Sequence, residues 1–335
     1  MKILRKVLFP VVPIYHGVTW LRNYCYDKDI LNSKKYDFPV ICVGNLSVGG
    51  TGKTPMIEYL IRLLKGDYLV GTLSRGYGRE TKDFILANEK ATAKSIGDEP
   101  FQFYHKFQEI IVSVGEDRQH AIDNLLHLEK APEVLLLDDA FQHRKVEAGL
   151  NILLTSYNDL YVNDMSLPTG NLREPKSGAK RADIIIVTKC PENITVNERE
   201  SIKRELNTEA HQEVFFSTIR YADSVISIKK EIALTELKSK QFTLVTGIAN
   251  PKPLVDHLQT NGFKFHHEVY KDHHDFSVSE VCELEKKELV VTTEKDYVRL
   301  KDKLNNSNVY YLPIASQILN ADAFDKKIKT FARSY

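Results

Sequence analysis

Residues 43–55 read Val43-Gly44-Asn45-Leu46-Ser47-Val48-Gly49-Gly50-Thr51-Gly52-Lys53-Thr54-Pro55. The residues just before this stretch, 39–43, form a short apolar run rich in β-branched side chains, which predicts a strand. Residues 56–64 carry apolar side chains at helical spacing, so a helix is expected there. A strand, a glycine-rich turn and a helix in this order are the setting that a phosphate-binding loop requires.

The glycines of this loop let successive backbone N–H groups turn toward an anion, and the helix N-terminus adds a partial positive charge. The Lys53 ammonium then reaches the β- and γ-phosphates, and the Thr54 hydroxyl ligates Mg²⁺. The alternative is a glycine-rich turn that binds nothing, and the Lys-Thr pair between a strand and a helix argues against it. The residues predicted to bind the nucleotide are Asn45, Ser47, Val48, Gly49, Gly50, Thr51, Gly52, Lys53 and Thr54.

The loop departs from the usual pattern at two positions. Ser47 stands where a glycine is usual, five residues before Gly52. The core around Gly49 and Gly50 also resembles the loop of ParA-like switch ATPases, but Val48 replaces their signature lysine.

The composition excludes some classes of protein. The chain has 335 residues, enough for two α/β domains. Its 46 basic and 45 acidic residues give a net charge of +1, so no overall field favours nucleic acid as a partner. Its cysteines lie far apart in the sequence and indicate thiols in a reducing compartment, not a disulfide framework or a zinc site. They are Cys25, Cys42, Cys190 and Cys282.

Residues 1–30 form a segment of their own. A basic start, residues 1–6, leads into the apolar run 7–15 and then into Trp20. This run is too short to span a bilayer and is interrupted by Pro10 and Pro13. An amphipathic helix in the plane of an anionic membrane fits this pattern, and a helix packed on the protein is the alternative.

Strand and helix patterns alternate through the remainder of the chain. From residue 39 to about 218 the alternation predicts a P-loop NTPase-like α/β fold, with a mostly parallel sheet and helices on both faces. A second, smaller α/β alternation begins at residue 242. We predict a nucleotide-binding domain over 31–220, a hinge near residue 220, and a smaller domain over 221–335 that completes the cleft.

Two acidic clusters are candidates for phosphoryl-transfer chemistry. The apolar run 134–137 ends in Asp138 and Asp139, as a Walker B strand does, and one of these carboxylates would hold Mg²⁺. Asp98 precedes a helix, where it is either an N-cap or a base for a substrate hydroxyl. The residues by themselves do not decide between the N-cap role and the base role of Asp98. His273 and His274 lie in a loop where one of them would orient a carboxylate or a hydroxyl, although an inert surface pair is as compatible with the pattern.

Glycines beside arginines at 74–79 indicate close approach of an anionic ligand. The segment Thr188-Lys189-Cys190-Pro191 lacks both asparagine and the final aspartate of the guanine-reading motif, so selectivity for GTP is not supported.

With these segments assembled, the chain resembles the tetraacyldisaccharide 4′-kinase (lipid A 4′-kinase) family. The matching motifs run in family order from residue 43 to 296. One position departs from the family pattern: Ala140 stands where the family more often has glycine. They are VGNLSVGGTGKTP at 43–55, SRGYGR at 74–79, GDEP at 97–100, DDAFQHR at 138–144, LPTGNLREP at 167–175, DHH at 272–274 and TTEKD at 292–296.

The resemblance implies transfer of the ATP γ-phosphoryl group to the 4′-hydroxyl of a tetraacyldisaccharide 1-phosphate in lipid A biosynthesis. It implies that Asp98 is the base, supported by His273, with Lys53 on the phosphates. Metal ligands implied by the family are Thr54, Asp138, Asp139 and Glu174, and substrate contacts are Arg75, Tyr77, Arg79, Gln142 and His143.

A substrate with four acyl chains stays in the bilayer, so the resemblance also implies a peripheral enzyme on the cytoplasmic face of the inner membrane. Residues 1–30 would then dock the cleft beside the lipid. The rival from another class is a nucleotide-dependent switch or metallochaperone-like P-loop GTPase. A third interpretation is a soluble small-molecule kinase with a packed N-terminus.

Overall fold

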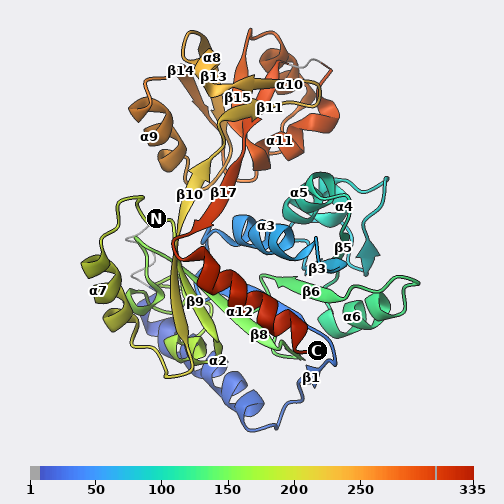
Figure 1. The fold of residues 1–335 in the computed structure, drawn as a ribbon, viewed down its shortest axis with the longest axis vertical. Coiled ribbons are helices and arrows are strands. Elements are labelled where there is room, and N and C mark those ends of the chain that lie inside the picture. The colour runs from blue at the N-terminus through green and yellow to red at the C-terminus, as the bar shows by residue number, and fades with distance from the viewer. Residues whose placement is uncertain (1–7, 306–307) are drawn as a thin grey trace.

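The computed structural model describes residues 8–305 and 308–335 of the chain. Within these residues the chain forms a large lobe around a nine-stranded sheet and a small lobe around a six-stranded sheet (Figure 1). A short two-stranded ladder joins β1 (Lys34–Lys35) to β7 (Val146–Glu147). The predicted α/β fold class is confirmed.

The sheet of the large lobe is parallel except at its two edges. Every residue of the central strand β2 is buried, because helices cover both faces of the sheet. Side chains from Ile41 and Val43 enter one core with α3 and α12, and those of Val40 and Cys42 enter the other. In order across the sheet the strands are β17 (Ile314–Ile318), β10 (Glu213–Tyr221), β9 (Ile184–Thr188), β8 (Leu150–Ser156), β2 (Val40–Asn45), β6 (Val134–Asp138), β3 (Val70–Ser74), β5 (Ile111–Val114) and β4 (Ile85–Leu86).

Helices and 3₁₀ turns lie between these strands along the chain. Its α-helices are α3 (Lys53–Leu64), α4 (Ala93–Ile96), α5 (Asp98–Lys106), α6 (Arg118–Leu126), α7 (Val196–Leu206) and α12 (Ala321–Arg333), with 3₁₀ turns η2 (Tyr161–Asn163) and η3 (Lys176–Arg181). Because the strands are parallel, β2, β3 and β6 all end at one edge, where residues 46–52, 75–79 and 139–145 follow them.

The small lobe has a mixed sheet with its own core. Its strand order is β12 (Glu231–Ala233), β11 (Ser224–Ile226), β16 (Val309–Leu312), β15 (Val290–Thr293), β13 (Gln241–Thr246) and β14 (Lys264–Val269). Its helices are α8 (Leu234–Leu237), α9 (Lys252–Thr260), α10 (Val278–Glu285), α11 (Glu294–Leu300) and the 3₁₀ turn η4 (Lys301–Lys303).

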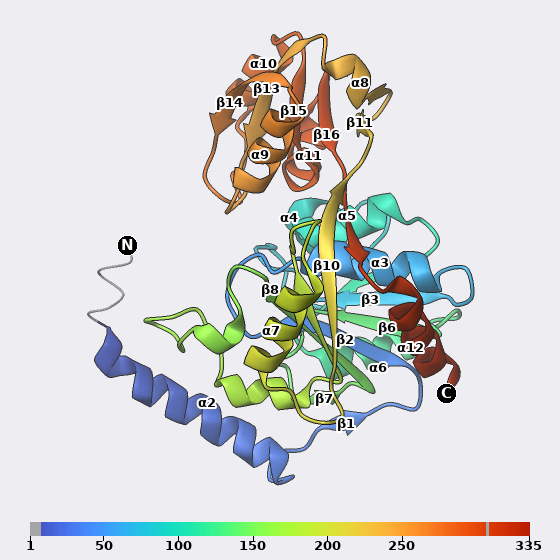
Figure 2. The same cartoon turned by 60° about the vertical axis from the view of Figure 1, so that its left-hand side comes forward.

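The C-terminal end of the chain differs from the prediction, which placed all of residues 221–335 in the smaller domain. Strand β17 pairs antiparallel with β10 in the large sheet, and α12 buries Phe324 and Ile328 against that sheet. The chain therefore passes between the lobes twice, through β10 and through β17 (Figures 1 and 2). The apolar face of α12 has helical periodicity, but periodicity does not tell which sheet covers it.

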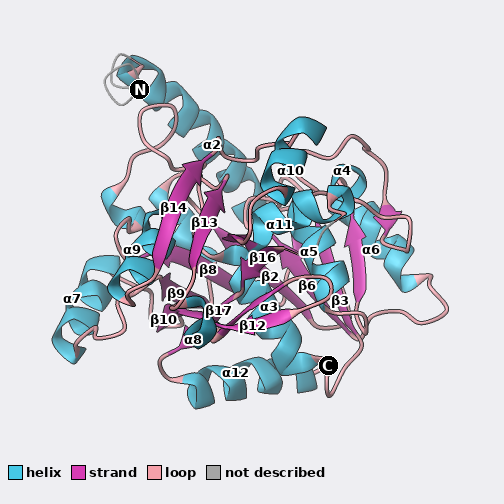
Figure 3. Ribbon diagram, turned by 90° about the horizontal axis from the view of Figure 1, so that it is seen from above, coloured by secondary structure: helices cyan, strands magenta, loops and turns pink. Residues whose placement is uncertain are grey.

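Helix α2 (Val12–Asp27), preceded by the 3₁₀ turn η1 (Phe9–Val11), lies along the margin of the large lobe (Figures 2 and 3). Only Asn23 and Tyr26 of α2 are buried. The basic residues 1–6 lie outside the described residues.

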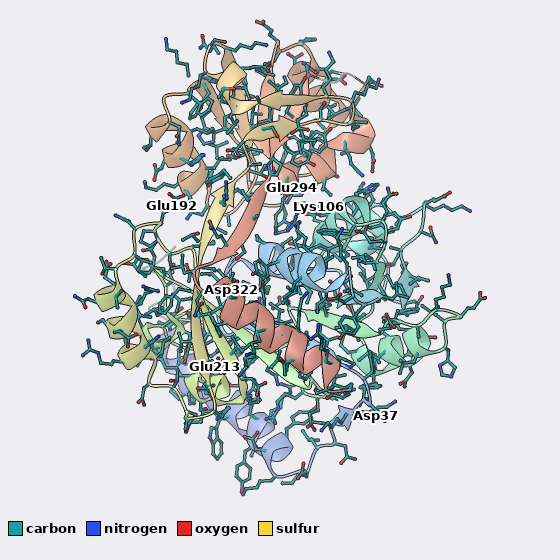
Figure 4. All side chains as sticks on the ribbon, viewed as in Figure 1. Asp37, Lys106, Glu192, Glu213, Glu294 and Asp322 are labelled. Atoms are coloured by element: carbon teal, nitrogen blue, oxygen red, sulfur yellow. The ribbon has the colours of Figure 1, made fainter. Side chains whose placement is uncertain are left out.

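The lobes touch along α5 and α11. Val298 of α11 packs with Ile96 and Phe101 of the large lobe. Beside this contact, the Lys106 ammonium lies 2.8 Å from a Glu58 oxygen and 2.7 Å from a Glu294 oxygen. Figure 4 shows Lys106 and Glu294 at the junction between the lobes. The Lys106 ammonium thus bridges two buried carboxylates from different lobes, and Arg62 pairs with Glu58 as well at 2.9 Å. Burial together with the Glu58 charge raises the pKa of Glu294 to about 7.

Replacing Lys106 with methionine should lower the free energy of unfolding by about 3 kcal/mol, because two buried carboxylates lose their shared cation. Chemical denaturation at pH 8 measures this loss. The matched control is Lys329→Met, which removes an exposed pair with Asp67 and should cost about 0.5 kcal/mol. Equal losses in the two variants would contradict the shared-cation interpretation.

Candidate active site

The phosphate loop lies between β2 and α3, as predicted. Gly49 and Gly52 adopt positive φ angles of 117° and 88°, which side chains with a Cβ rarely adopt. Gly52 is the N-cap of α3, and the helix begins at Lys53. The first N–H groups of a helix have no intrahelical partner, so the start of α3 offers donors to an anion held in the loop.

Neighbouring segments brace this loop. The Thr188 hydroxyl, at the end of β9, donates a 2.7 Å hydrogen bond to the Thr51 carbonyl. The Val48 N–H donates to the Asn171 carbonyl at 2.8 Å. The loop therefore keeps its curvature through contacts with both a strand end and the segment 165–173.

Lys53 lies at the junction of the loop and the acidic strand end. Its ammonium is 3.3 Å from Asn45 Oδ1 and 3.5 Å from Asp139 Oδ1. Arg173 donates to both oxygens of Asp139 at 2.9 and 3.0 Å. Asp139 has a positive φ of 50°, so the strand end turns its carboxylate toward these two cations.

Asp138 is almost fully buried, and its Oδ2 accepts a 3.2 Å hydrogen bond from Ser74. Its Oδ1 is buried and has no hydrogen-bond partner within the described part of the chain. Burial, with smaller contributions from Asp139 and Glu99, raises the pKa of Asp138 to about 6. A buried carboxylate oxygen without a donor fits a hard cation such as Mg²⁺, which prefers oxygen ligands.

Glu174 was predicted among the metal ligands, and the structure gives its carboxylate other partners. It accepts hydrogen bonds from Asn23 at 2.6 Å, from Gln142 at 3.0 Å and from Arg181 at 2.8 Å. Among residues 8–305 and 308–335, no group of three His, Cys, Asp or Glu side chains is placed to hold a metal ion. Glu174 is therefore an internal anchor for α2, because two amides and a guanidinium satisfy its oxygens.

Gln142 and His143 were predicted on the substrate side. The Gln142 amide has partners within the protein, whereas the buried Nε2 of His143 has no hydrogen-bond partner among the described residues. The Gln142 amide donates to the Asn45 carbonyl at 2.8 Å as well as to Glu174, so it ties the end of β2 to the α2 anchor. Burial and the Arg118 charge lower the pKa of His143 to about 4, which keeps this imidazole neutral.

The structure brings Asp98 and His273 together from opposite lobes. The two side chains meet at 3.2 Å between Asp98 Oδ2 and His273 Nδ1. Asp98 is the first residue of α5, and the Arg299 Nε from α11 donates to the same oxygen at 2.8 Å. His274 instead contacts Glu280 at 3.0 Å, so the choice of His273 agrees with the geometry.

These contacts move both pKa values. Burial by itself raises the pKa of Asp98, but the hydrogen bond from His273 and the charge of Arg299 outweigh it and leave the pKa below its ordinary value. The same hydrogen bond raises the pKa of His273 against the opposing effects of burial and Arg299. Asp98 is therefore ionised at neutral pH, and His273 and Arg299 both contact its Oδ2.

The loop 74–79 divides into exposed and internal residues. Tyr77 is 78% exposed, and its ring centroid lies 6.1 Å from that of His273. The Arg75 side chain is 66% exposed and lies 3.5 Å from Glu116. Arg79 was predicted to contact the substrate, and its guanidinium donates to the Lys82 and Asp83 carbonyls at 2.9 Å each.

The sequence analysis did not name four residues that contribute contacts to the site. Arg173 and Ser74 stand inside the quoted segments 167–175 and 74–79, so a closer reading of those segments offered a signal. Asn23 and Arg299 lie outside every quoted segment, and their contacts depend on tertiary packing.

The phosphate loop, the buried strand-end carboxylate and the ionised aspartate fit a phosphotransferase with a P-loop. The family model described as tetraacyldisaccharide-1-P 4′-kinase matches residues 4–333. The chain belongs to the tetraacyldisaccharide-1-P 4′-kinase family.

Individual relatives agree with this membership. The tetraacyldisaccharide 4′-kinase of Flavobacterium psychrophilum is 51% identical, covering 100% of this chain and 98% of the relative. That of Bacteroides thetaiotaomicron is 42% identical, covering 98% and 94%. The crystal structure of the "apo" form of LpxK from Aquifex aeolicus in complex with ATP superposes with a TM-score of 0.80 at 33% identity, covering 98% of this chain and 99% of that one.

The pairing of His273 with Asp98 predicts a titration that does not depend on catalysis. In the parent protein the His273 pKa lies above 6.5, and Asp98→Asn should lower it by removing the charge on its partner. Because the folded-state pKa is raised, the stabilisation from this pair is complete below pH 6.5 and is lost as the pH rises through the folded-state value. NMR titration of the labelled imidazoles measures the change, and identical His273 midpoints in both proteins would contradict the pairing.

Proposed function

We propose that this chain transfers the γ-phosphoryl group of ATP to the 4′-hydroxyl of a tetraacyldisaccharide 1-phosphate at the cytoplasmic face of the inner membrane. The observation that carries the residue assignment is the Asp98–His273 contact, which joins the lobes beside the phosphate loop. Glu99, the neighbour of Asp98, lies close enough to Asp138 for its charge to act on that carboxylate. This influence supports placing the proposed base and the strand-end carboxylates in one site.

In this proposal the backbone amides of the phosphate loop, residues 46–52, hold the β- and γ-phosphates and Lys53 adds its charge there. Asp138 and Thr54 would hold Mg²⁺, which neutralises charge on the phosphates. Asp139 is not a metal ligand in this proposal, because Arg173 and Lys53 contact its oxygens. Its role is to fix the position of the Lys53 ammonium.

Asp98 would accept the proton of the attacking 4′-hydroxyl. Its lowered pKa makes it a weak base, but it is ionised at neutral pH and ready to accept. Phosphoryl transfer through a loose transition state depends mainly on the orientation of the nucleophile, so a weak base that is firmly held is sufficient. His273 orients the Asp98 carboxylate through its Nδ1 contact.

The substrate headgroup would enter beside the loop 74–79. Tyr77 offers an exposed ring next to His273, and Arg75 offers an exposed guanidinium that can pair with a phosphate. Both side chains extend from the end of β3, on the same sheet edge as the phosphate loop. We keep these two residues as proposed substrate contacts.

The two lobes, joined by β10 and β17, are proposed to act as domains that change their separation as the nucleotide binds. The hinge near residue 220 then includes both connecting strands, since Tyr221 pairs with Ile314 at this point. A switch GTPase, the rival function, has no support in the site, because no guanine-reading pair follows β9.

We propose that α2 attaches the enzyme to the membrane as a peripheral helix. Large apolar side chains of this region stand exposed: Leu8, Phe9, Val11, Ile14, Val18, Trp20, Leu21 and Tyr24 are between 41% and 68% exposed. Across the described residues, no helix is both long enough and apolar enough to cross a bilayer. The opposite side of α2 is tied to the active site, because Tyr15 donates to the Arg173 carbonyl at 2.8 Å and Asn23 to Glu174 at 2.6 Å. A helix held in this way and apolar on its outer face suits the membrane interface.

Replacing Asp98 with asparagine should reduce kcat by about 100-fold or more, because the 4′-hydroxyl loses its proton acceptor. Phosphoryl transfer from labelled ATP to tetraacyldisaccharide 1-phosphate in detergent micelles measures the rate. MgATP affinity should persist in this variant, whereas Lys53→Ala should weaken it. An Asp98→Asn enzyme as fast as the parent would remove Asp98 from the proposed mechanism.

The double substitution Ile14→Glu and Val18→Glu should weaken binding to anionic phospholipid vesicles by about 10-fold or more, because two exposed apolar side chains on one helix face become charged. Sedimentation with the vesicles measures the bound fraction. The control is Val278→Glu in the small lobe, which changes a valine that is 76% exposed and should leave binding as in the parent. Unchanged sedimentation of the double variant would exclude α2 as the anchor.

A further inference from the structure

Arg299 reaches the proposed base from the interior of the small lobe. Its side chain is only 7% exposed, and its Nε donates to Asp98 Oδ2 at 2.8 Å. This contact is shorter than the 3.2 Å contact of His273 with the same oxygen. Two donors from the small lobe therefore converge on one oxygen of a side chain in the large lobe.

Other contacts of the guanidinium fix Arg299 in place. Its Nη1 donates to Asp296 Oδ1 at 3.1 Å and to the Gly247 carbonyl at 3.3 Å. Asp296 is fully buried and accepts a further hydrogen bond from the Gly247 N–H at 3.0 Å. Arg299 is therefore held by a buried carboxylate and by the end of β13, so the guanidinium has little freedom to turn.

The same carbonyl also sets the loop that carries His273. The His273 N–H donates to the Gly247 carbonyl at 3.1 Å, and His273 has a positive φ of 56°. Gly247 has no room for a side chain, since a Cβ there would lie 2.9 Å from Asp296 Oδ1. One frame, made of Asp296, Arg299 and the Gly247 carbonyl, thus fixes both donors to Asp98.

We propose that Arg299 is a positioning residue for phosphoryl transfer, which orients the Asp98 carboxylate through the Nε contact. The inference rests on the proposed role of Asp98 as the base. When two donors hold one oxygen of a carboxylate, the orientation of the other oxygen is fixed as well. A general base needs this fixed orientation to accept the proton of a hydroxyl group.

A simple ion pair between the lobes would not account for this arrangement. The lobes are already joined by the Lys106 contact to Glu294 and by a 2.6 Å contact between Lys295 and Glu99. Arg299 adds nothing to those pairs, and its contact goes to Asp98 instead. Charged groups around Asp98 that bear on its titration are Glu99 on its own helix, Lys295, Asp296 and Arg299 on α11, and His273 with its neighbour Asp272 on the loop.

The test compares Arg299→Gln, Arg299→Lys and Lys106→Met with the parent, using MgATP and tetraacyldisaccharide 1-phosphate in detergent micelles from pH 3 to 9, over the pH range in which each protein stays folded. Arg299→Gln should lower kcat by about 10- to 100-fold through misplacement of the base. Activity falls as Asp98 takes up a proton, which in the parent happens below pH 3.8 because the Asp98 pKa is lowered, and loss of the Arg299 charge raises that pKa. The acid limb of kcat should therefore move to higher pH.

Arg299→Lys separates charge from geometry. The lysine keeps the positive charge, so its acid limb should stay near that of the parent, but one ammonium does not reproduce the fixed fork, so kcat should remain low. Lys106→Met removes a contact between the lobes that does not involve Asp98, and it should leave the acid limb in place. Circular dichroism and MgATP affinity show that each variant is folded.

The outcomes distinguish the two levels of the proposal. If Asp98→Ala keeps the parent rate, the proposed function of Asp98 fails, and the inference on Arg299 fails with it. If Asp98→Ala is inactive while Arg299→Gln keeps the parent kcat, or loses kcat without any shift of the acid limb, only the positioning role is overturned.

Discussion

The structure depends on the shared edge at which parallel strands β2 and β6 end. Val43 is paired with Asp138 across the two strands, so the phosphate loop and the acidic pair begin side by side. Lys53 then lies 3.5 Å from Asp139, although 86 residues separate them in the sequence. Because helices cover both faces of the sheet, this polar edge is where the buried strands meet a ligand.

Charge balance around that edge explains several contacts that look unrelated in sequence. Arg173 and Lys53 neutralise Asp139, whereas Asp138 has a buried oxygen without a donor within the described chain. Two adjacent carboxylates thereby acquire different environments, one paired with cations and one suited to a metal ion. The α2 anchor extends the same network, since Gln142 connects Asn45 to Glu174 and Glu174 accepts from Asn23.

The small lobe completes the site through one helix and one loop. Helix α11 contacts α5 through Val298, and it sends Lys295 and Arg299 to consecutive residues of α5, Glu99 and Asp98. The loop after β14 supplies His273. Every one of these contacts crosses between lobes that only β10 and β17 connect within the described residues, so the geometry at Asp98 depends on how the lobes are held together.

The residue pattern was enough to predict the α/β class, the strand–loop–helix around Lys53 and the buried strand ending in Asp138 and Asp139, whereas the pairing of Asp98 with His273 was implied by the family resemblance. These features follow from local periodicity or from ordered motifs. Long-range packing, visible in the folded protein alone, returns residues 314–333 to the large sheet and brings Asn23 of α2 to Glu174. It also directs Arg79 to the Lys82 carbonyl and Arg299 to Asp98. Such assignments depend on which buried donor meets which carboxylate across long sequence separations, and no local pattern encodes that choice.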